Sequence, residues 1–92
     1  MKAKLLRRIR EVWRRGVIEG VIREVPEPVS ASEHRIKYRL AHVVAGVCVV
    51  GYDNERGKGD HKHIRDSEAP CVFTDVSALI RDFLNDVKEV ES

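Results

Sequence analysis

The hydrophobic pattern changes period along the chain and is clearest over residues 76–90. Apolar side chains recur there at the three- and four-residue spacing of one helical face: Val76, Leu79, Ile80, Phe83, Leu84, Val87 and Val90. This spacing predicts an amphipathic helix over residues 75–88, with Thr74 or Asp75 as its N-cap. An apolar stripe must be buried against another element, so we expect the helix to cover one face of a sheet.

Residues 34–52 show the two-residue period of β-strands. Every second side chain is apolar or neutral, at positions Ile36, Tyr38, Leu40 and His42. The apolar segment 47–52 ("VCVVGY") follows the turn-like pair Ala45-Gly46. This arrangement predicts a hairpin of two strands, the first of them half-buried. The prolines of "PEPVSAS" (26–32) predict a loop before the hairpin.

The first 25 residues fit two different elements. Their apolar residues have helical spacing: Leu5, Leu6, Ile9, Val12, Trp13, Val17, Ile18, Val21, Ile22 and Val25. The same spacing would give two short helices broken at Gly16. The density of β-branched residues in "VIEGVIREV" (17–25) favours strands instead. Periodicity alone does not decide between the two for short apolar segments.

Composition places the chain among soluble globular proteins. Its 92 residues are 42% hydrophobic and 35% charged, which predicts a single domain over residues 1–92. No apolar segment approaches the roughly 18 residues of a membrane span, and "MKAKLLRRIREVWRR" lacks a continuous apolar segment. We therefore expect a cytoplasmic protein that does not enter a membrane. In that compartment Cys48 and Cys71 are expected to be buried thiols rather than a disulfide.

Charge is unevenly distributed although the net charge is only +2. Residues 1–24 contain eight basic and three acidic residues, a local charge of +5. Residues 75–92 contain two basic and five acidic residues, a local charge of −3. The basic part suits a polyanion or an acidic protein partner. A solvated surface of a small polar protein explains the same charges.

Candidate chemistry is concentrated in "GYDNERGKGDHKHIRDSE" (51–68). Gly57 and Gly59 flank Lys58, so the backbone there can approach a ligand closely. Consecutive amides in such a turn can bind an anion, with Lys58 and Arg56 adding positive charge. The alternative is an ordinary turn, because the Ser or Thr and the helix that follow the glycines of a phosphate-binding loop are missing here.

His61 and His63 are separated by one residue. If residues 60–64 are extended, both rings project to the same face. Two imidazoles on one face can act as general acid and base on RNA, whose 2′-hydroxyl is a built-in nucleophile. The alternatives are a surface pair of histidines, or two ligands of a metal with Asp53 or Asp60 as a third. Tyr52 could stack on a base or donate a proton.

The segment "YDNERGKGDHKHI" (52–64) resembles the signature of the TumE family of toxin–antitoxin proteins. The similarity extends over roughly residues 3–88, and includes "APCVFTDVSALIRDFLNDV" (69–87). The chain departs from the family pattern in having "RRG" (14–16) where members tend to have an Asp-Gly turn. It also has Lys62 where members commonly have arginine. The resemblance implies strands over residues 4–13 and 17–25.

The expected fold is therefore α+β, a small antiparallel β-meander of four or five strands with the C-terminal helix packed on one face. Residues 52–70 are expected to leave the sheet as a loop or bent strand. Loops held by a rigid sheet are common positions for functional sites.

The resemblance implies a toxin whose partner is a cognate antitoxin, and most small toxins of this kind act on RNA or translation. Our leading hypothesis is an RNA-binding toxin or metal-independent endoribonuclease, with RNA and a second copy of the chain as further expected partners. The expected catalytic residues are His61, His63, Lys58 and Arg56. The expected substrate-binding residues are Tyr52, Asp53, Asn54, Gly57, Gly59 and Asp60. No cofactor and no metal are expected, because Lys58 would repel a cation. The alternative is a non-catalytic protein-binding module in which residues 52–63 form a structural loop.

Overall fold

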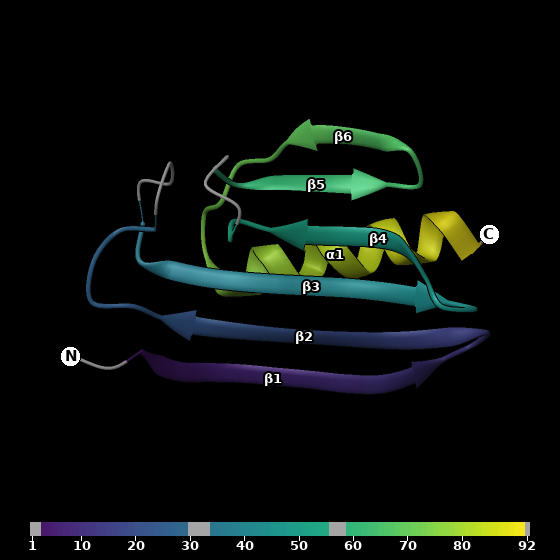
Figure 1. Ribbon diagram of the computed structural model, residues 1–92, viewed down its shortest axis with the longest axis horizontal. Helices are drawn as coiled ribbons and strands as arrows, with labels where there is room; N and C mark the ends of the chain where they lie inside the picture. The colour runs from purple at the N-terminus through teal and green to yellow at the C-terminus, as the bar shows by residue number, and fades with distance from the viewer. Residues whose placement is uncertain (1–2, 30–33, 56–58, 92) are drawn as a thin grey trace.

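The chain forms a six-stranded antiparallel sheet with one helix against one face (Figure 1). A computed structural model describes residues 3–29, 34–55 and 59–91. The strands lie side by side in chain order, each antiparallel to the next. The elements are β1 (Lys4–Trp13), β2 (Gly16–Glu24), β3 (Ile36–Val44), β4 (Val47–Asp53), β5 (His61–Ile64), β6 (Ser67–Pro70) and α1 (Val76–Glu91).

Tight turns join these strands into three hairpins. Arg14, Ala45 and Arg65 each begin a two-residue turn, with φ angles of 53°, 51° and 54°. Turns of positive φ match the twist of the strands they connect, so they fix the register of each hairpin. The turn predicted at Ala45-Gly46 is confirmed, and Gly46 has a φ of 79°.

The predicted α+β class is confirmed, but the predicted number of strands is wrong. Residues 61–64 and 67–70 form β5 and β6, where the sequence predicts a loop or bent strand. β5 pairs with β4 from Asp53 to Val50. This pairing provides hydrogen-bond partners for the backbone amides and carbonyls, and it does not depend on the side chains. Residues 4–24 are a strand hairpin, as the family resemblance implies, and the helical alternative is wrong.

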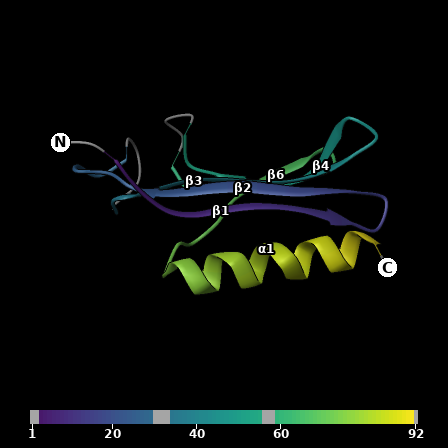
Figure 2. The same cartoon turned by 90° about the horizontal axis from the view of Figure 1, so that it is seen from below.

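Helix α1 lies across one face of the sheet, behind β3 and β4 in Figure 1 and below the sheet in Figure 2. The Asp75 carboxylate accepts a hydrogen bond of 2.8 Å from the Ala78 amide, which caps the helix. The buried helical residues are Leu79, Phe83 and Val87, as the spacing predicts. They pack against the buried side chains of Ile18, Ile22, Tyr38, Leu40, Val50 and Tyr52. No described helix has the length and apolar character needed to cross a membrane.

The opposite side of the sheet, called here the helix-free face, has no described element packed on it (Figure 2). Side chains alternate between the faces along each strand, so the neighbours of the core residues project to this side. Ile18 and Ile22 are in the core, for example, and Glu19, Val21 and Arg23 therefore belong to the helix-free face. The register of the strands then determines which of these side chains are neighbours.

Candidate active site

Strand β5 carries both candidate histidines and sends them to the helix-free face. The alternate residues, Lys62 and Ile64, point to the helix side. Lys62 Nζ lies 3.3 Å from the Asp86 carboxylate of α1, and Ile64 packs against the core. His61 and His63 therefore share the other face, with about 7 Å between their Cα atoms. The extended backbone that this shared face requires is present in the four residues of β5.

The register places arginines and histidines in two neighbouring rows across the sheet. One row runs through Glu68, His63, Gly51, Ala41, Glu19 and Arg10. The next row runs through Pro70, His61, Asp53, Arg39, Val21 and Arg8. Residues directly opposite each other in an antiparallel pair lie on the same face. The helix-free face thus combines imidazoles at one side of the sheet with guanidinium groups at the other.

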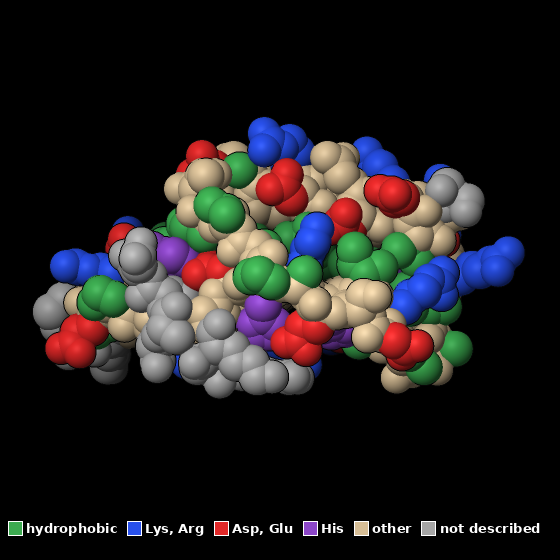
Figure 3. Space-filling view, turned by 90° about the horizontal axis from the view of Figure 1, so that it is seen from above, with side chains coloured by type: hydrophobic (Ala, Val, Ile, Leu, Met, Phe, Trp, Pro, Cys, Tyr) green, Lys and Arg blue, Asp and Glu red, His purple; other side chains and the backbone are tan. Residues whose placement is uncertain are grey.

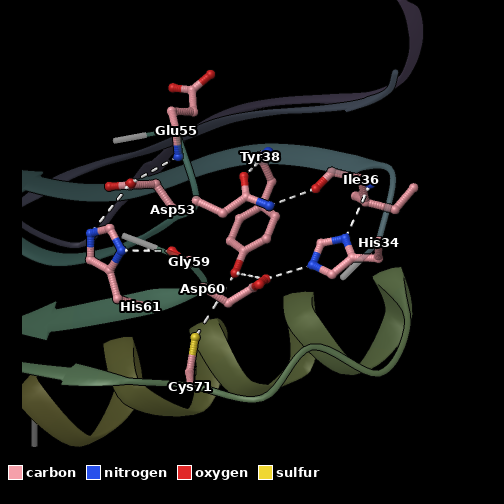
Figure 4. Close-up of polar contacts among 10 residues, drawn as sticks. His34, Ile36, Tyr38, Asp53, Glu55, Gly59, Asp60, His61 and Cys71 are labelled. Carbon is pink, nitrogen blue, oxygen red and sulfur yellow. Dashed lines mark hydrogen bonds and ion pairs between the residues drawn. The ribbon is translucent and has the colours of Figure 1, made fainter. Parts of the chain in front are cut away.

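His61 is held by acceptors on both sides of its ring (Figure 4). Its Nδ1 atom lies 3.0 Å from the Gly59 carbonyl oxygen, and Gly59 adopts a positive φ of 80° to present that oxygen. Its Nε2 atom lies 3.4 Å from the Asp53 carboxylate and 3.7 Å from that of Glu68. The residue is only 6% exposed. Both ring nitrogens of His61 thus face hydrogen-bond acceptors.

His63 has different surroundings from His61. It is partly exposed, and its ring lies directly over Gly51 of β4. A Cβ atom added at Gly51 would come within 2.5 Å of the His63 Cε1 atom, so the glycine makes room for the imidazole. No described residue forms a hydrogen bond with the His63 ring. Among these residues, the His63 ring is contacted from below by Gly51.

A basic hollow lies beside the histidines on the same face. Its volume is about 460 Å³. It is lined by Arg8, Ile9, Arg10, Glu19, Gly20, Val21, Arg23, Arg39, Ala41 and Glu55. Four of these side chains are arginines and two are glutamates, so the hollow has an excess of positive charge. Arg39 and Ala41 are cross-strand neighbours of Asp53 and Gly51, which connects the hollow to the histidines.

Tyr52 lies on the opposite face from the histidines. Its hydroxyl donates a hydrogen bond to Asp86 of α1, and its ring packs edge-on against Phe83 with centroids 5.7 Å apart. Burial, together with the hydrogen bond to Asp86, raises the pKa of the Tyr52 phenol far above its ordinary value. The phenol is therefore a neutral donor that ties the sheet to the helix. Asp53 lies on the face of the histidines, beside His61, and Tyr52 does not.

Asn54 and Asp60 both hold the ends of strands together. Asn54 is fully buried, and its side-chain amide accepts from the Tyr38 amide at 3.1 Å and donates to the Ile36 carbonyl at 2.7 Å. The Asp60 carboxylate lies 2.7 Å from His34 Nε2 and accepts from the Tyr38 hydroxyl at 2.8 Å (Figure 4). Arg56, Gly57 and Lys58, the other predicted phosphate-binding residues, lie outside the described residues.

The Tyr38 and Cys71 side chains next to this network are not reactive groups. Burial raises the pKa of the Tyr38 phenol, and its hydrogen bond to Asp60 raises it further. Burial also raises the pKa of the Cys71 thiol, although its contact with Tyr38 opposes that shift. Cys48 and Cys71 do not form a disulfide, as predicted, but both are half-buried where the sequence predicts buried thiols. Within residues 3–29, 34–55 and 59–91, no three His, Cys, Asp or Glu residues are grouped to hold a metal ion.

Comparison with known protein families shows to which family the chain belongs. The family model described as toxin TumE matches residues 3–91. The chain belongs to the toxin TumE family. The resemblance identified from the sequence is thus confirmed for almost the whole chain. Membership in the TumE family implies a toxin of a toxin–antitoxin system with a cognate antitoxin as its partner. No curated protein and no solved structure matches the chain.

Three residues with contacts in this TumE chain are missing from the site predicted from the sequence: Arg39, Gly51 and His34. Arg39 and Gly51 line the site, but their spacing from the histidines along the chain gives no sign of proximity. Arg39 could have been placed by the alternation in 36–42, because a charged residue between buried ones faces away from the helix. His34 stacks on Phe73 with ring centroids 4.0 Å apart, a contact that no local pattern indicates.

Proposed function

We propose that this toxin cleaves RNA, with the helix-free face as its substrate surface and His61 and His63 as its acid–base pair. The observation that carries the proposal is the presence of both imidazoles beside a basic hollow on one uncovered face. RNA supplies its own nucleophile in the 2′-hydroxyl group. Its cleavage therefore needs a base, an acid and positive charge near the phosphate.

In this mechanism His63 is the general base, because its ring nitrogens have no hydrogen-bond partner among the described residues. It takes the proton from the 2′-hydroxyl, and the oxygen attacks the adjacent phosphorus atom. The bond from phosphorus to the 5′-oxygen breaks as the new bond forms. The leaving 5′-oxygen takes a proton from His61, and the other product ends in a 2′,3′-cyclic phosphate.

His61 suits the role of general acid because hydrogen-bond acceptors on both sides of its ring fix the orientation of the imidazole. The Gly59 carbonyl fixes the Nδ1 side of the ring, and Asp53 orients the Nε2 side. A substrate oxygen reaches Nε2 by displacing Glu68, whose carboxylate lies 3.7 Å away on a side chain that is 48% exposed. Asp53 then remains beside Nε2 as the positioning residue.

Positive charge for the phosphate comes from arginines of the helix-free face. Arg39 is the exposed neighbour of Asp53 across the β3–β4 pair, and Arg8 follows it in the same row. Guanidinium groups bind phosphate through two parallel hydrogen bonds. We propose that Arg56 and Lys58, with the amides at Gly57, hold the scissile phosphate, as the sequence predicts.

A second candidate is a non-catalytic module that binds another protein through the same face. It is favoured by the internal use of several polar side chains of the 52–63 segment. Asn54, Asp60 and Tyr52 all make hydrogen bonds within the fold. On this hypothesis the segment is a structural connection, and the histidines have no chemical role.

Cleavage of RNA but not DNA tests the proposal directly. The purified protein is incubated with an RNA oligonucleotide and with DNA of the same sequence, both in the presence of a chelator. We expect the RNA to be cut and to carry 2′,3′-cyclic phosphate ends, since DNA lacks the nucleophile. Uncut RNA, or equal cutting of DNA, would reject the mechanism. Toxicity that persists without cleavage would support the binding module instead.

Binding of RNA should also depend steeply on salt. Each phosphate neutralised on a single strand contributes about −0.7 to the slope of log K against log salt concentration. Reversal of charge at Arg8 or Arg39 removes such a contact, so each variant should bind RNA more weakly and show a smaller slope. The matched control is Arg81→Glu, at a 68% exposed position on α1. Equal weakening by Arg81→Glu would indicate a nonspecific charge effect.

A further inference from the structure

The two edges of the sheet differ in their ability to accept another strand (Figure 1). The β6 edge has only four residues and ends in Pro70, which lacks an amide hydrogen. The β1 edge has ten residues and contains no proline. Its register is interrupted between Leu5 and Arg7, so the regular part runs from Arg7 to Trp13. An edge of this length presents a row of backbone donors and acceptors to another chain.

The exposed side chains of β1 are both apolar and basic. Leu5 is 50% exposed, Leu6 40% and Val12 83%, and they are three of the five large hydrophobic residues that the structure describes as exposed. The strand also carries four basic residues, Lys4, Arg7, Arg8 and Arg10, against the single acid Glu11. Exposed apolar side chains on an unpaired edge are typical of a binding site.

We infer that the β1 edge is the docking site of an extended acidic segment of the antitoxin, which pairs with β1 as a seventh strand. Backbone hydrogen bonds to the edge would supply affinity. Acidic side chains on the added strand would be favoured, because they would lie beside arginines of β1. These are Arg8 and Arg10 on one face and Arg7 on the other. Apolar side chains would lie beside Val12 and Leu5.

A second copy of this chain fits the same edge poorly. In the antiparallel pairing with full overlap of β1, Arg7 would lie opposite Arg10 of the other copy. A shift by one residue in either direction places Arg8 opposite Arg10 or opposite the other Arg8. Like charges directly opposite each other destabilise a strand pair. The charge pattern therefore favours an acidic partner over self-association.

Docking at this edge would also neutralise the helix-free face. Arg8 and Arg10 line the basic hollow, and acidic side chains next to them would compete with RNA phosphates. The docking itself rests on the edge and its charges and does not depend on RNA cleavage. The two proposals can therefore fail separately.

The test uses two labelled peptides as long as β1, one alternating valine with glutamate and the other alternating valine with lysine. We expect the full-length protein to bind the glutamate peptide and not the lysine peptide, as measured by fluorescence anisotropy without RNA. Hydrogen exchange should slow at outward-facing amides of residues 7–13. Val12→Asp should weaken binding at least about tenfold, because Val12 shares a face with Arg8 and Arg10 and the added carboxylate would repel the glutamates of the peptide.

The matched control is Val72→Asp, because Val72 is 86% exposed and lies outside the strands. This variant should bind the peptide like the unmodified protein. No binding of the glutamate peptide at about 1 mM, or equal binding of both peptides, would overturn the inference. So would protection that appears at residues 67–70 instead of 7–13. Protection of β1 in the protein alone, together with a doubled mass, would assign the edge to a second copy.

Discussion

The variant Phe83→Ala is expected to lower the free energy of unfolding by about 3–5 kcal/mol. Phe83 is fully buried at the centre of the α1 stripe and meets the Tyr52 ring at an interplanar angle of 85°. Alanine would remove this contact and leave a cavity that the sheet cannot close, because β4 is fixed by its neighbours on both sides. Domains of this size have a total stability of about 5–15 kcal/mol, so the loss would be a large part of it.

Denaturant unfolding followed by circular dichroism measures this loss. The control is Val72→Ala, at a position 86% exposed, where the change should stay within about 0.5 kcal/mol. A cost for Phe83→Ala below about 1 kcal/mol would mean that α1 does not pack through this face.

The parts of the fold that follow from the sequence are those with a strong hydrophobic period. The seven apolar positions from Val76 to Val90 define one helical face, and all of them belong to the core or pack against it. The alternation from Ile36 to His42 likewise identifies the buried side of β3. In both cases burial of one face requires the period that the sequence shows, so the pattern and the structure have the same cause.

Strands β5 and β6 could not be predicted because their sequences show no such hydrophobic period. "HKHI" and "SEAP" contain few β-branched or aromatic residues, and all of β6 is exposed. Their turn begins with Arg65 at positive φ, a conformation for which arginine gives no signal. The two strands exist because β4 has a free edge beside them, and that edge is a property of the tertiary structure.

The site was predictable to the extent that neighbouring residues share one strand. The two histidines occupy alternate positions of β5, so one assumption of extended structure is enough to place them on one face. Tyr52 and Asp53 are adjacent in the same strand and therefore face opposite ways. Sequence proximity alone groups them together, and only the register shows that Asp53 belongs with His61.

Replacement of His63 by alanine is expected to reduce RNA cleavage by about 10²–10⁴-fold and to abolish toxicity, with little effect on folding. The His63 ring has no hydrogen-bond partner within residues 3–29, 34–55 and 59–91, and it is partly exposed. His61→Ala should cause a similar loss of cleavage. Its stability should be lower than that of His63→Ala, since His61 is buried and bonded to Gly59. Cleavage rates and thermal unfolding, measured on the same preparations, separate the two effects.

Gly51→Ala gives an independent test that leaves both histidines in place. Its Cβ atom would approach the His63 Cε1 atom to 2.5 Å, so the ring must rotate away from its position over β4. Cleavage should fall because the base is displaced, whereas RNA binding through the arginines should remain. The control is His34→Gln. His34 contacts Asp60, which also accepts a hydrogen bond from Tyr38 on the helix side of the sheet, so this substitution leaves His61 and His63 unchanged. Full activity in both His63→Ala and Gly51→Ala would show that the imidazole is not the base. The binding module would then be the better account of the helix-free face.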